Sequence, residues 1–416
     1  VTCVDVDENK VKLMESGVSP IYEDGLEELM KRNNAAGRLH YTTDYKSAYK
    51  DPDAIFIGVG TPEQPDGSAN LGYIATVCRQ IAENVEKDCL VVVKSTVPVG
   101  TNDHVEQFIK DFLVRKELHI EVASNPEFLA QGSAVHDTLH AARIIIGTES
   151  EEAEKLLREI YEPFQLPIVA MNRRSAEMTK YAANSFLAVK ISYANEIANI
   201  CEKVGADAEM VRIGMCSDKR IGSQFLFPGL GYGGSCFPKD VKALLKTAKD
   251  NGCDYQLLES ADKVNKLQRQ IFIDKILKRF GENLSGMTFG IWGLAFKPKT
   301  NDMREAPSIT IIEALLERGA KVQAYDPKAF DCAEMIFGDR ITYTKSSYDA
   351  LENADCMLLL TEWNEFRRPD FDRIKALLKE PVIFDGRNQY DAKRLVERGF
   401  EYYSVGKKYE IQKSMV

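Results

Sequence analysis

A lone cysteine in this chain stands beside a helix start and a cluster of glycines. Residues 228–240 read PGLGYGGSCFPKD, so Cys236 precedes Pro238, Lys239 and Asp240. Proline suits the first turn of a helix, and KDVKALLKTA continues that helix. The free N–H groups and the dipole at a helix start stabilise a thiolate, and Lys239 adds positive charge. We therefore predict that Cys236 is a nucleophile, although a lone cysteine is more often a small core residue.

The glycines of the same stretch nearly spell the fingerprint of a dinucleotide-binding turn. That turn must follow a strand and open a helix. The preceding residues, RIGSQFLF, lie in a helical block, so we reject a cofactor role for the glycines. We interpret them as a flexible backbone wrap that lets something large approach closely, because glycine leaves room beside the backbone.

The elements that must position these residues follow from the hydrophobic pattern. In the first 172 residues, short β-branched runs alternate with helical patterns, which predicts a parallel, doubly wound sheet. Its expected strands are residues 1–5, 54–62, 89–101, 119–128 and 142–148, with helices near 71–87 and 102–115.

A block without strand patterns follows. Residues 175–204 contain no Pro or Gly and repeat apolar residues at helical spacing, which predicts one long helix ending at Gly205. Strand patterns return at residues 287–296, 321–327, 355–361 and 381–386. We predict an α/β domain over residues 1–172, a central helical domain over 173–284 and a second α/β domain over 285–416.

Composition limits the class of protein. The 416 residues are too many for one ordinary core, and 44% apolar residues suffice to fill several. A net charge of -9 argues against nucleic acid as the main partner. The nine cysteines form no CxxC pair, which argues against disulfides and a metal site and favours a reducing, cytoplasmic location. No run of apolar residues is long enough to predict a membrane span, and we expect no signal peptide before the first domain.

The first strand pattern ends on an acidic residue, Asp5. In a dinucleotide fold such a residue ends the second strand, about 20 residues after the glycine loop, and binds the ribose hydroxyls. Because only four residues precede Asp5, we expect that the first strand and the glycine loop are missing and that the first sheet is interrupted beside this strand. The alternative is that Asp5 only caps a helix.

Taken together, these motifs resemble the UDP-glucose 6-dehydrogenase family of nucleotide-sugar dehydrogenases, along essentially the whole chain. The most specific match is RIGSQFLFPGLGYGGSCFPKD at residues 220–240. The other matches, in the family's order, are VDVDENKV at the start, KSTVPVGT (94–101), SNPEFLAQG (124–132), KYAANSFLA (180–188), GLAFKPKTNDMRE (293–305) and FDGR (384–387). The resemblance implies two Rossmann-like domains joined by a central helical dimerisation domain, with NAD bound to the first and UDP to the last.

The family oxidises the C6 alcohol of UDP-glucose to a carboxylate with two NAD and one water. A thiolate holds the intermediate aldehyde as a thiohemiacetal, and the second oxidation gives a thioester that water hydrolyses. Carried over by motif, Cys236 resembles that nucleophile. Lys180 and Asn184, one helical turn apart, resemble the pair that stabilises the oxyanions. Glu127 and Asp240 resemble the carboxylates that handle protons and the hydrolytic water.

The remaining contacts also come from the resemblance. Thr96 belongs to the catalytic neighbourhood, and Arg220 resembles a residue that reaches the substrate of a neighbouring subunit. Many members carry an acid where this chain has Gln131, which cannot exchange a proton but can still hydrogen-bond sugar or cofactor. The implied NAD contacts are Asp5, Lys10, Val59, Gly60, Thr61, Ser95, Thr96, Val97, Gln131 and Arg304. The implied substrate contacts are Glu127, Phe128, Leu129, Lys180, Arg220, Phe227, Gly231, Tyr232, Gly233, Phe296, Lys297 and Arg387.

Other functions stay open at this point. The nearest rivals are dehydrogenases of GDP-mannose or UDP-N-acetylmannosamine, although relatives of the second typically have a His before the Cys. A non-catalytic NAD-sensing protein would need no thiolate, and neither would a 2-hydroxyacid-type dehydrogenase. We expect UDP-glucose as the substrate, NAD as the cofactor, no metal, no nucleic acid or membrane partner, and a homodimer or higher homo-oligomer.

Overall fold

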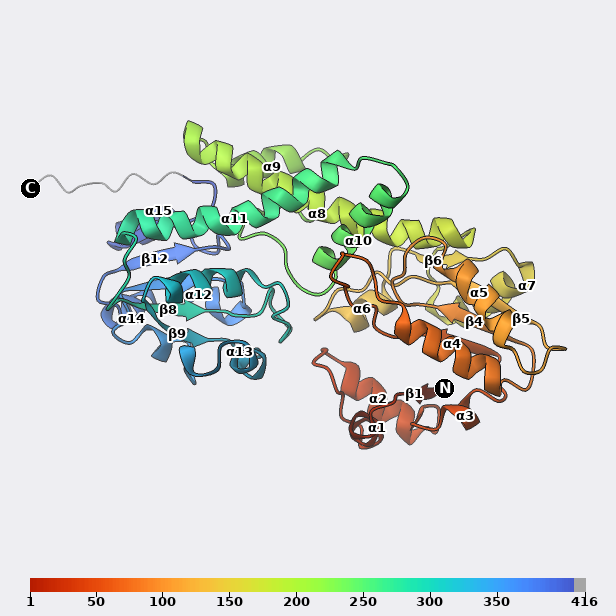
Figure 1. The fold of residues 1–416 in the computed structure, drawn as a ribbon. Coiled ribbons are helices and arrows are strands. Elements are labelled where there is room, and N and C mark those ends of the chain that lie inside the picture. Colours follow the sequence, from red (N-terminus) through yellow and green to blue (C-terminus); the bar gives the residue numbers. More distant parts are fainter. Residues whose placement is uncertain (408–416) are drawn as a thin grey trace, which may run out of the picture. The chain divides into compact units, whose positions relative to one another are not determined.

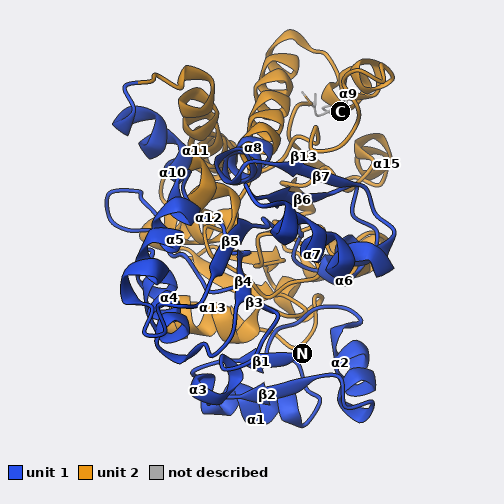
Figure 2. Cartoon of the chain, turned by 90° about the vertical axis from the view of Figure 1, so that its right-hand side faces the viewer, with its two compact units in different colours: residues 1–183, 242–252 blue, residues 184–241, 253–416 orange. Residues whose placement is uncertain are grey.

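The computed structural model describes residues 1–407 and divides into two compact units. Unit 1 contains residues 1–183 and 242–252, and unit 2 contains residues 184–241 and 253–416 (Figure 2). Two of the three boundaries fall inside helices, α8 (Arg173–Val204) and α10 (Phe237–Asp250), and the third follows α10. The division into three domains stays a prediction, and residues 408–416 of its last domain lie outside the described residues.

Unit 1 is an α/β unit in which helices and strands alternate, as the sequence predicts. Its elements are β1 (Thr2–Val4), α1 (Glu8–Glu15), α2 (Leu26–Ala35), β2 (His40–Thr42), α3 (Tyr45–Ala48), β3 (Ala54–Ile57), α4 (Gly72–Asn84), β4 (Cys89–Val93), α5 (Thr101–Phe112), β5 (Ile120–Ser124), α6 (Ala134–Leu139), β6 (Ile144–Gly147), α7 (Glu151–Tyr161), the 3-10 helix η1 (Glu162–Phe164) and β7 (Ile168–Met171), followed by the start of α8. The five strands β3 to β7 form one sheet in sequence order.

Two features of these strands differ from a continuous parallel sheet. The single pairing of β5 with β6, between Ser124 and Gly147, is antiparallel, so β6 and β7 run against β3, β4 and β5. In the described residues β1 pairs with β2 in a separate, two-stranded sheet. The interruption that we expected beside the strand leading to Asp5 is therefore present.

The core of unit 1 explains why this order of elements folds. All five residues of β4, CLVVV, are buried, as expected of a central strand covered on both faces. Apolar residues of α4 and α5 cover one face of the sheet, including Ile81 and Ile109. Residues of α7, including Leu157, pack against other strand residues such as Val92. The carboxyl ends of β3, β4 and β5 are thereby held in fixed positions.

Unit 2 joins helices to a second sheet. After the end of α8 its elements are α9 (Ala208–Cys216), the start of α10, α11 (Gln256–Phe280), β8 (Thr288–Trp292), α12 (Pro307–Glu317), β9 (Lys321–Tyr325), α13 (Phe330–Phe337), η2 (Gly338–Arg340), β10 (Thr342–Tyr343), η3 (Asp349–Leu351), β11 (Cys356–Leu359), η4 (Asn364–Phe366), α14 (Phe371–Leu377), β12 (Val382–Asp385), α15 (Ala392–Glu397) and β13 (Glu401–Tyr403). The strands form an all-parallel sheet in the order β10-β9-β8-β11-β12-β13, which is the doubly wound arrangement that we predicted.

The predicted long helix is confirmed as α8, which is 32 residues long and ends one residue before Gly205 (Figure 1). Its second half lies beside α11: Ser192 donates to the Ala261 carbonyl, and Asn199 pairs with Gln268. Both helices share a core with the second sheet. None of the helices in the described part of the chain has the length and apolar character needed to cross a bilayer.

Candidate active site

Cys236 caps the start of α10, as the sequence predicts. Helix α10 begins at Phe237, and the Asp240 N–H donates to the Cys236 carbonyl over 2.9 Å in the first helical hydrogen bond. The thiol is exposed and free, and its Sγ lies 3.7 Å from Ser235 Oγ. An exposed thiol at a helix start, where the first N–H groups have no acceptor within the helix, can act as a nucleophile.

Two other predicted catalytic residues of unit 2 meet each other. Asp240 is 1% exposed, and its carboxylate accepts a hydrogen bond from Asn184 Nδ2 over 2.6 Å. Lys239 Nζ donates to the other oxygen over 2.8 Å. The positive charge that we expected of Lys239 therefore pairs with Asp240. An Asn amide has two N–H donors, so Asn184 keeps one for a further acceptor.

A further cation belongs to the surroundings of Cys236. Arg304 forms a two-point pair with Asp302, at 2.9 and 2.7 Å, and the Gly234 N–H donates to the Arg304 carbonyl. The hydrogen bond to Asp302 raises the pKa of Arg304, and the charge of a Cys236 thiolate adds to that rise. We expected Arg304 to contact NAD, and that role stays a prediction.

The glycine segment before Cys236 is buried and tightly held, which differs from the flexible wrap that we expected. A Cβ at Gly231 would collide with the Asn265 amide, and one at Gly233 would lie 3.0 Å from the Glu305 carbonyl carbon. A Cβ at Gly234 would lie 2.7 Å from the Phe296 ring. The close approaches in this structure are therefore made by the protein's own residues.

Buried polar side chains hold the same segment, and the sequence analysis missed them. Asn265 both accepts from the Tyr232 N–H and donates to the Tyr232 carbonyl. Arg269 donates to the carbonyls of Tyr232 and Glu305. Asn195 and Gln268 bind the N–H and carbonyl of Gly229 in the same way. The available signal was a polar residue in α11, Asn265, followed three and four residues later by Gln268 and Arg269, all on one helix face among apolar residues.

A cavity of about 710 Å³ in unit 2 is lined by the glycine segment and by residues that follow β11 and β12. Three arginines line it: Arg367, Arg368 and Arg387. Arg387 is fixed by hydrogen bonds to the carbonyls of Leu360 and Phe296. Only Arg387 was predicted from the sequence. Three guanidinium groups at one cavity suit a diphosphate.

The other predicted substrate residues of unit 2 lie in different surroundings. Phe227 and Gly231 line the same cavity, and Lys297 lies 5.5 Å over the Phe296 ring. Tyr232 is 5% exposed and packs edge-on against Phe237. The side chain of Arg220 is 89% exposed and pairs with Asp218.

Unit 1 brings Glu127 and Lys180 together. Lys180 Nζ lies 2.8 Å from Glu127 Oε1, and the lysine side chain is 4% exposed. The other carboxylate oxygen accepts the Leu129 N–H over 2.6 Å. The Phe128 ring lies 5.5 Å from Lys180 Nζ and 3.9 Å from the Arg143 guanidinium. A buried cation thus faces an anchored carboxylate, and Lys180 stands one turn before Asn184 on α8.

The predicted NAD loops of unit 1 lie together at the carboxyl ends of β3 and β4. Ser95 Oγ donates to the Val59 carbonyl, and Thr61 Oγ1 donates to the Thr96 carbonyl. A Cβ at Gly60 would meet nothing within 4 Å, so space remains there for a ligand.

At the end of β1, Asp5 accepts the Asp7 N–H and lies 4.0 Å from Lys10. Asp5 therefore does not cap helix α1, whose N-cap is Asp7. A partly exposed carboxylate fits a ribose, and the open loops at the strand ends fit the rest of a dinucleotide. Gln131 is half-buried in the segment before α6, and the buried residue Val97 follows Thr96.

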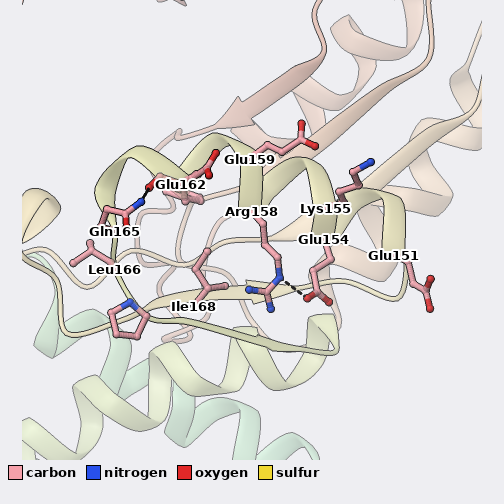
Figure 3. Close-up of a pocket in the computed structure, with 11 residues that line it drawn as sticks. Glu151, Glu154, Lys155, Arg158, Glu159, Glu162, Gln165, Leu166 and Ile168 are labelled. Carbon is pink, nitrogen blue, oxygen red and sulfur yellow. Dashed lines mark hydrogen bonds and ion pairs between the residues drawn. The ribbon is translucent and has the colours of Figure 1, made fainter.

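A second hollow, of about 940 Å³, lies in unit 1 (Figure 3). Residues of α7, η1 and β7 line it, and it contains none of the predicted site residues. Its charged side chains include the ion pair of Arg158 with Glu154 at 2.7 Å. Among residues 1–407, no cluster of three or more His, Cys, Asp or Glu side chains is arranged to hold a metal.

Known proteins of the same architecture match this chain throughout. The domain models of the UDP-glucose/GDP-mannose dehydrogenase family match residues 1–165 (NAD binding domain), 174–267 (central domain) and 290–392 (UDP binding domain). UDP-glucose 6-dehydrogenase YwqF of Bacillus subtilis is 49% identical over 408 residues, 98% of this chain and 92% of that protein. A UDP-glucose 6-dehydrogenase of Pseudomonas aeruginosa is 44% identical over 417 residues, again 98% of this chain and 92% of that protein.

Solved structures agree with these sequence matches. The structure of a UDP-glucose dehydrogenase from the archaeon Pyrobaculum islandicum has a TM-score of 0.91 at 36% identity, covering 98% of this chain and 92% of that chain. A UDP-D-ManNAc dehydrogenase from Pyrococcus horikoshii has a TM-score of 0.85 at 26% identity, covering 98% and 93%. The chain, with a cysteine at the start of a helix and an α/β sheet in each unit, belongs to the UDP-glucose/GDP-mannose dehydrogenase family.

Proposed function

We propose that this protein is an NAD-dependent UDP-glucose 6-dehydrogenase, which oxidises the C6 alcohol of UDP-glucose to the carboxylate of UDP-glucuronate. The observation that carries the proposal is the exposed thiol of Cys236 at the start of α10. One helical turn later stands the buried Asp240, which is hydrogen-bonded to Asn184 of α8. Binding alone needs no such thiol, whereas a four-electron oxidation does, because a free aldehyde would escape between its two steps.

The proposed chemistry has three steps. In the first, the C6 carbon loses a hydride and its hydroxyl loses a proton, which gives the aldehyde. In the second, the Cys236 thiolate adds to the aldehyde carbon, and loss of another hydride converts the thiohemiacetal to a thioester. In the third, water replaces the sulfur and restores Cys236. NAD, when bound, accepts the hydride of each oxidation.

The surrounding side chains have separate roles in this proposal. Lys180 and the second N–H of Asn184 donate to the oxyanions that form on the C6 oxygen. Glu127 and Asp240 accept protons from the alcohol and from the hydrolytic water. Arg387, with Arg367 and Arg368, binds the diphosphate of UDP, and this role is supported by the cavity that the three share.

The stoichiometry of the reaction tests the proposal. Full-length protein should form two NADH for each UDP-glucose consumed and leave UDP-glucuronate as the product. Cys236→Ser should still bind both ligands but should lose net conversion by at least about 10³-fold, because a hydroxyl is a far weaker nucleophile than a thiolate. One NADH per sugar, or near-normal turnover by Cys236→Ser, would reject the thioester route. Faster turnover of GDP-mannose or UDP-N-acetylmannosamine would select another substrate.

We further propose that a second copy of the chain covers the apolar faces of α8 and α9. The exposed fractions of Phe186, Ile200 and Val204 are 63%, 55% and 71%, and Met210 and Ile213 on α9 are 63% and 49% exposed. Large apolar side chains gathered on neighbouring elements mark an interaction surface. The exposed Arg220 follows α9, as a residue that reaches a neighbouring subunit would.

Light scattering tests the proposed homodimer. The wild-type chain should be a dimer or larger at micromolar concentration, and Ile200→Asp should shift it toward monomer. Met335→Asp is the matched control, because Met335 is equally apolar and 79% exposed but lies on α13. A monomeric wild-type protein would reject the dimer.

A further inference from the structure

The second sheet has the strand order of a nucleotide-binding fold. In the order β10-β9-β8-β11-β12-β13 the chain moves outward from β8 to β9 and β10, and then returns to β11 on the other side of β8. Ligands of such sheets bind at this reversal, outside the carboxyl ends of the strands. The cavity of about 710 Å³ is lined by residues that follow β11 and β12, so it belongs to this edge of the sheet.

The acid that usually binds a ribose in such a sheet is already engaged in unit 2. That acid stands at the end of the second strand, which here is β9, and Asp326 follows β9 directly. Its Oδ2 accepts the Leu294 and Ala295 N–H groups over 2.7 and 3.0 Å. The Trp363 indole also donates to Oδ2, and two N–H groups at the start of α13 donate to Oδ1. These donors fill the roughly four acceptor positions of a carboxylate, so Asp326 has none left for a ribose.

Glu362 is a second carboxylate at the same edge of the sheet. It stands three residues after the end of β11 and lines the cavity. Arg387 Nε lies 3.1 Å from Glu362 Oε2, but the N–H of that nitrogen donates to the Leu360 carbonyl over 2.7 Å. Within residues 1–407, this shielded oxygen accepts no hydrogen bond. Because 35% of the side chain is exposed, the rest of the carboxylate can meet a donor that enters the cavity.

The charge of Glu362 limits which part of a nucleotide it can bind. An ionised carboxylate only accepts hydrogen bonds, and the ionised oxygens of a diphosphate also only accept them. The diphosphate therefore suits the three arginines and is repelled by Glu362. The ribose hydroxyls are donors, and the ribose is bonded directly to the diphosphate. The uracil N–H is also a donor, but it is one unit further from the diphosphate that Arg387 is proposed to bind.

We propose that Glu362 binds the ribose hydroxyls of the nucleotide sugar, in the role that Asp326 cannot take. Its contact with Arg387 sets the carboxylate beside the proposed diphosphate site. Glu362 then selects ribonucleotides over deoxyribonucleotides and does not itself distinguish uracil from another base. The inference rests on the proposed UDP site at the three arginines of the cavity.

Calorimetric titration of the full-length protein with UDP, 2′,3′-dideoxy-UDP and inorganic pyrophosphate tests this role. The wild type should bind UDP at least about tenfold more tightly than the dideoxy nucleotide, because hydrogen bonds to a charged group are lost. Glu362→Gln should weaken UDP binding about tenfold and should bind dideoxy-UDP no more weakly than the wild type does. Pyrophosphate should bind this variant equally or more tightly, since a negative charge beside the arginines is removed.

Glu365→Gln is the matched control, because it removes the same charge three residues later from a side chain that does not line the cavity. It should bind all three ligands as the wild type does. Unchanged UDP affinity in Glu362→Gln, or equal weakening of UDP and dideoxy-UDP, would overturn the proposal. Weaker pyrophosphate binding would also overturn it and would leave Glu362 only the task of holding Arg387. If the wild type binds neither UDP nor pyrophosphate, the proposed UDP site fails as well.

Discussion

The contact of Gly233 with Glu305 leads to a prediction that separates a structural glycine from a ligand-binding one. A Cβ at Gly233 would lie 3.0 Å from the Glu305 carbonyl carbon, nearer still to its oxygen, and 3.3 Å from the Ala306 Cα. All of these atoms are backbone, so no side chain can rotate away. Gly233→Ala must therefore separate the glycine segment from residues 304–306. The backbone angle φ of Gly233 is not positive, so the collision alone sets the cost.

The magnitude follows from the contacts that this separation strains. The adjacent hydrogen bonds join the Gly234 N–H to the Arg304 carbonyl over 2.8 Å, and Arg269 to the Glu305 carbonyl over 3.0 Å. Overpacking of a buried site costs about 1–3 kcal/mol, and each weakened hydrogen bond adds roughly 1 kcal/mol. We expect a loss of about 3 kcal/mol, which lowers the melting temperature of a unit of this size by roughly 6–12 °C.

Turnover should fall as well, because the displaced segment carries Cys236. A shift of about 1 Å in a reacting group can lower the rate by roughly 100-fold. Calorimetry and NADH formation measure the two effects. Gly214→Ala is the control: Gly214 lies in α9 with open space around it, and alanine there should stabilise the helix by up to about 1 kcal/mol. An unchanged melting temperature with a raised KM for Gly233→Ala would refute the packing argument and assign the glycine to substrate binding.

Two further predictions concern a buried carboxylate and the proposed UDP site. Glu177 is 2% exposed and accepts hydrogen bonds from the Gly100 and Asn102 N–H groups, and burial raises its pKa above the ordinary 4.5. The folded state therefore holds this proton to higher pH than the unfolded state, so the contribution of Glu177 to the free energy of unfolding falls as pH rises above about 4.5. In Glu177→Gln this part of the pH dependence should be absent when the free energy of unfolding is measured in urea between about pH 4 and pH 8. Arg387→Met should weaken UDP binding by roughly 10- to 100-fold in calorimetric titration, because a charge-assisted hydrogen bond is lost; Arg373→Met, an exposed arginine over the Tyr348 ring, should bind UDP normally. Unchanged UDP affinity in Arg387→Met would show that the diphosphate binds elsewhere.

Much of the fold could be read from local pattern. Residues 175–204 lack Pro and Gly and repeat apolar residues at helical spacing, and the structure has α8 there. The buried run CLVVV is a central strand, as expected of an apolar run between helical patterns. The place of Cys236 at a helix start followed from Pro238 and the helical pattern KDVKALLKTA after it. Each of these properties depends on neighbours within a few residues, which is why periodicity and composition are sufficient.

The direction of β6 and the reason for the glycines needed the tertiary structure. No local pattern shows that β6 and β7 run against β3, β4 and β5, because an apolar strand reads the same in either direction. The short strands β2 and β10 carry too few residues for a period. Gly233 is a glycine because Glu305, far along the chain, approaches it, and a sequence pattern contains no such distance.

For the candidate site, the sequence alone determined which residue types are present and in what order. It indicated a candidate nucleophile at a helix start, a lysine and an asparagine one helical turn apart as candidate donors, and candidate carboxylates in their motifs. The tertiary structure decided which of them meet: Lys180 with Glu127, and Asn184 with Asp240. It also brought Lys94 to Asn125, a pair that no motif suggests. The physical reason is that charge pairing depends on separations of a few ångströms, and only the packing of distant segments sets these.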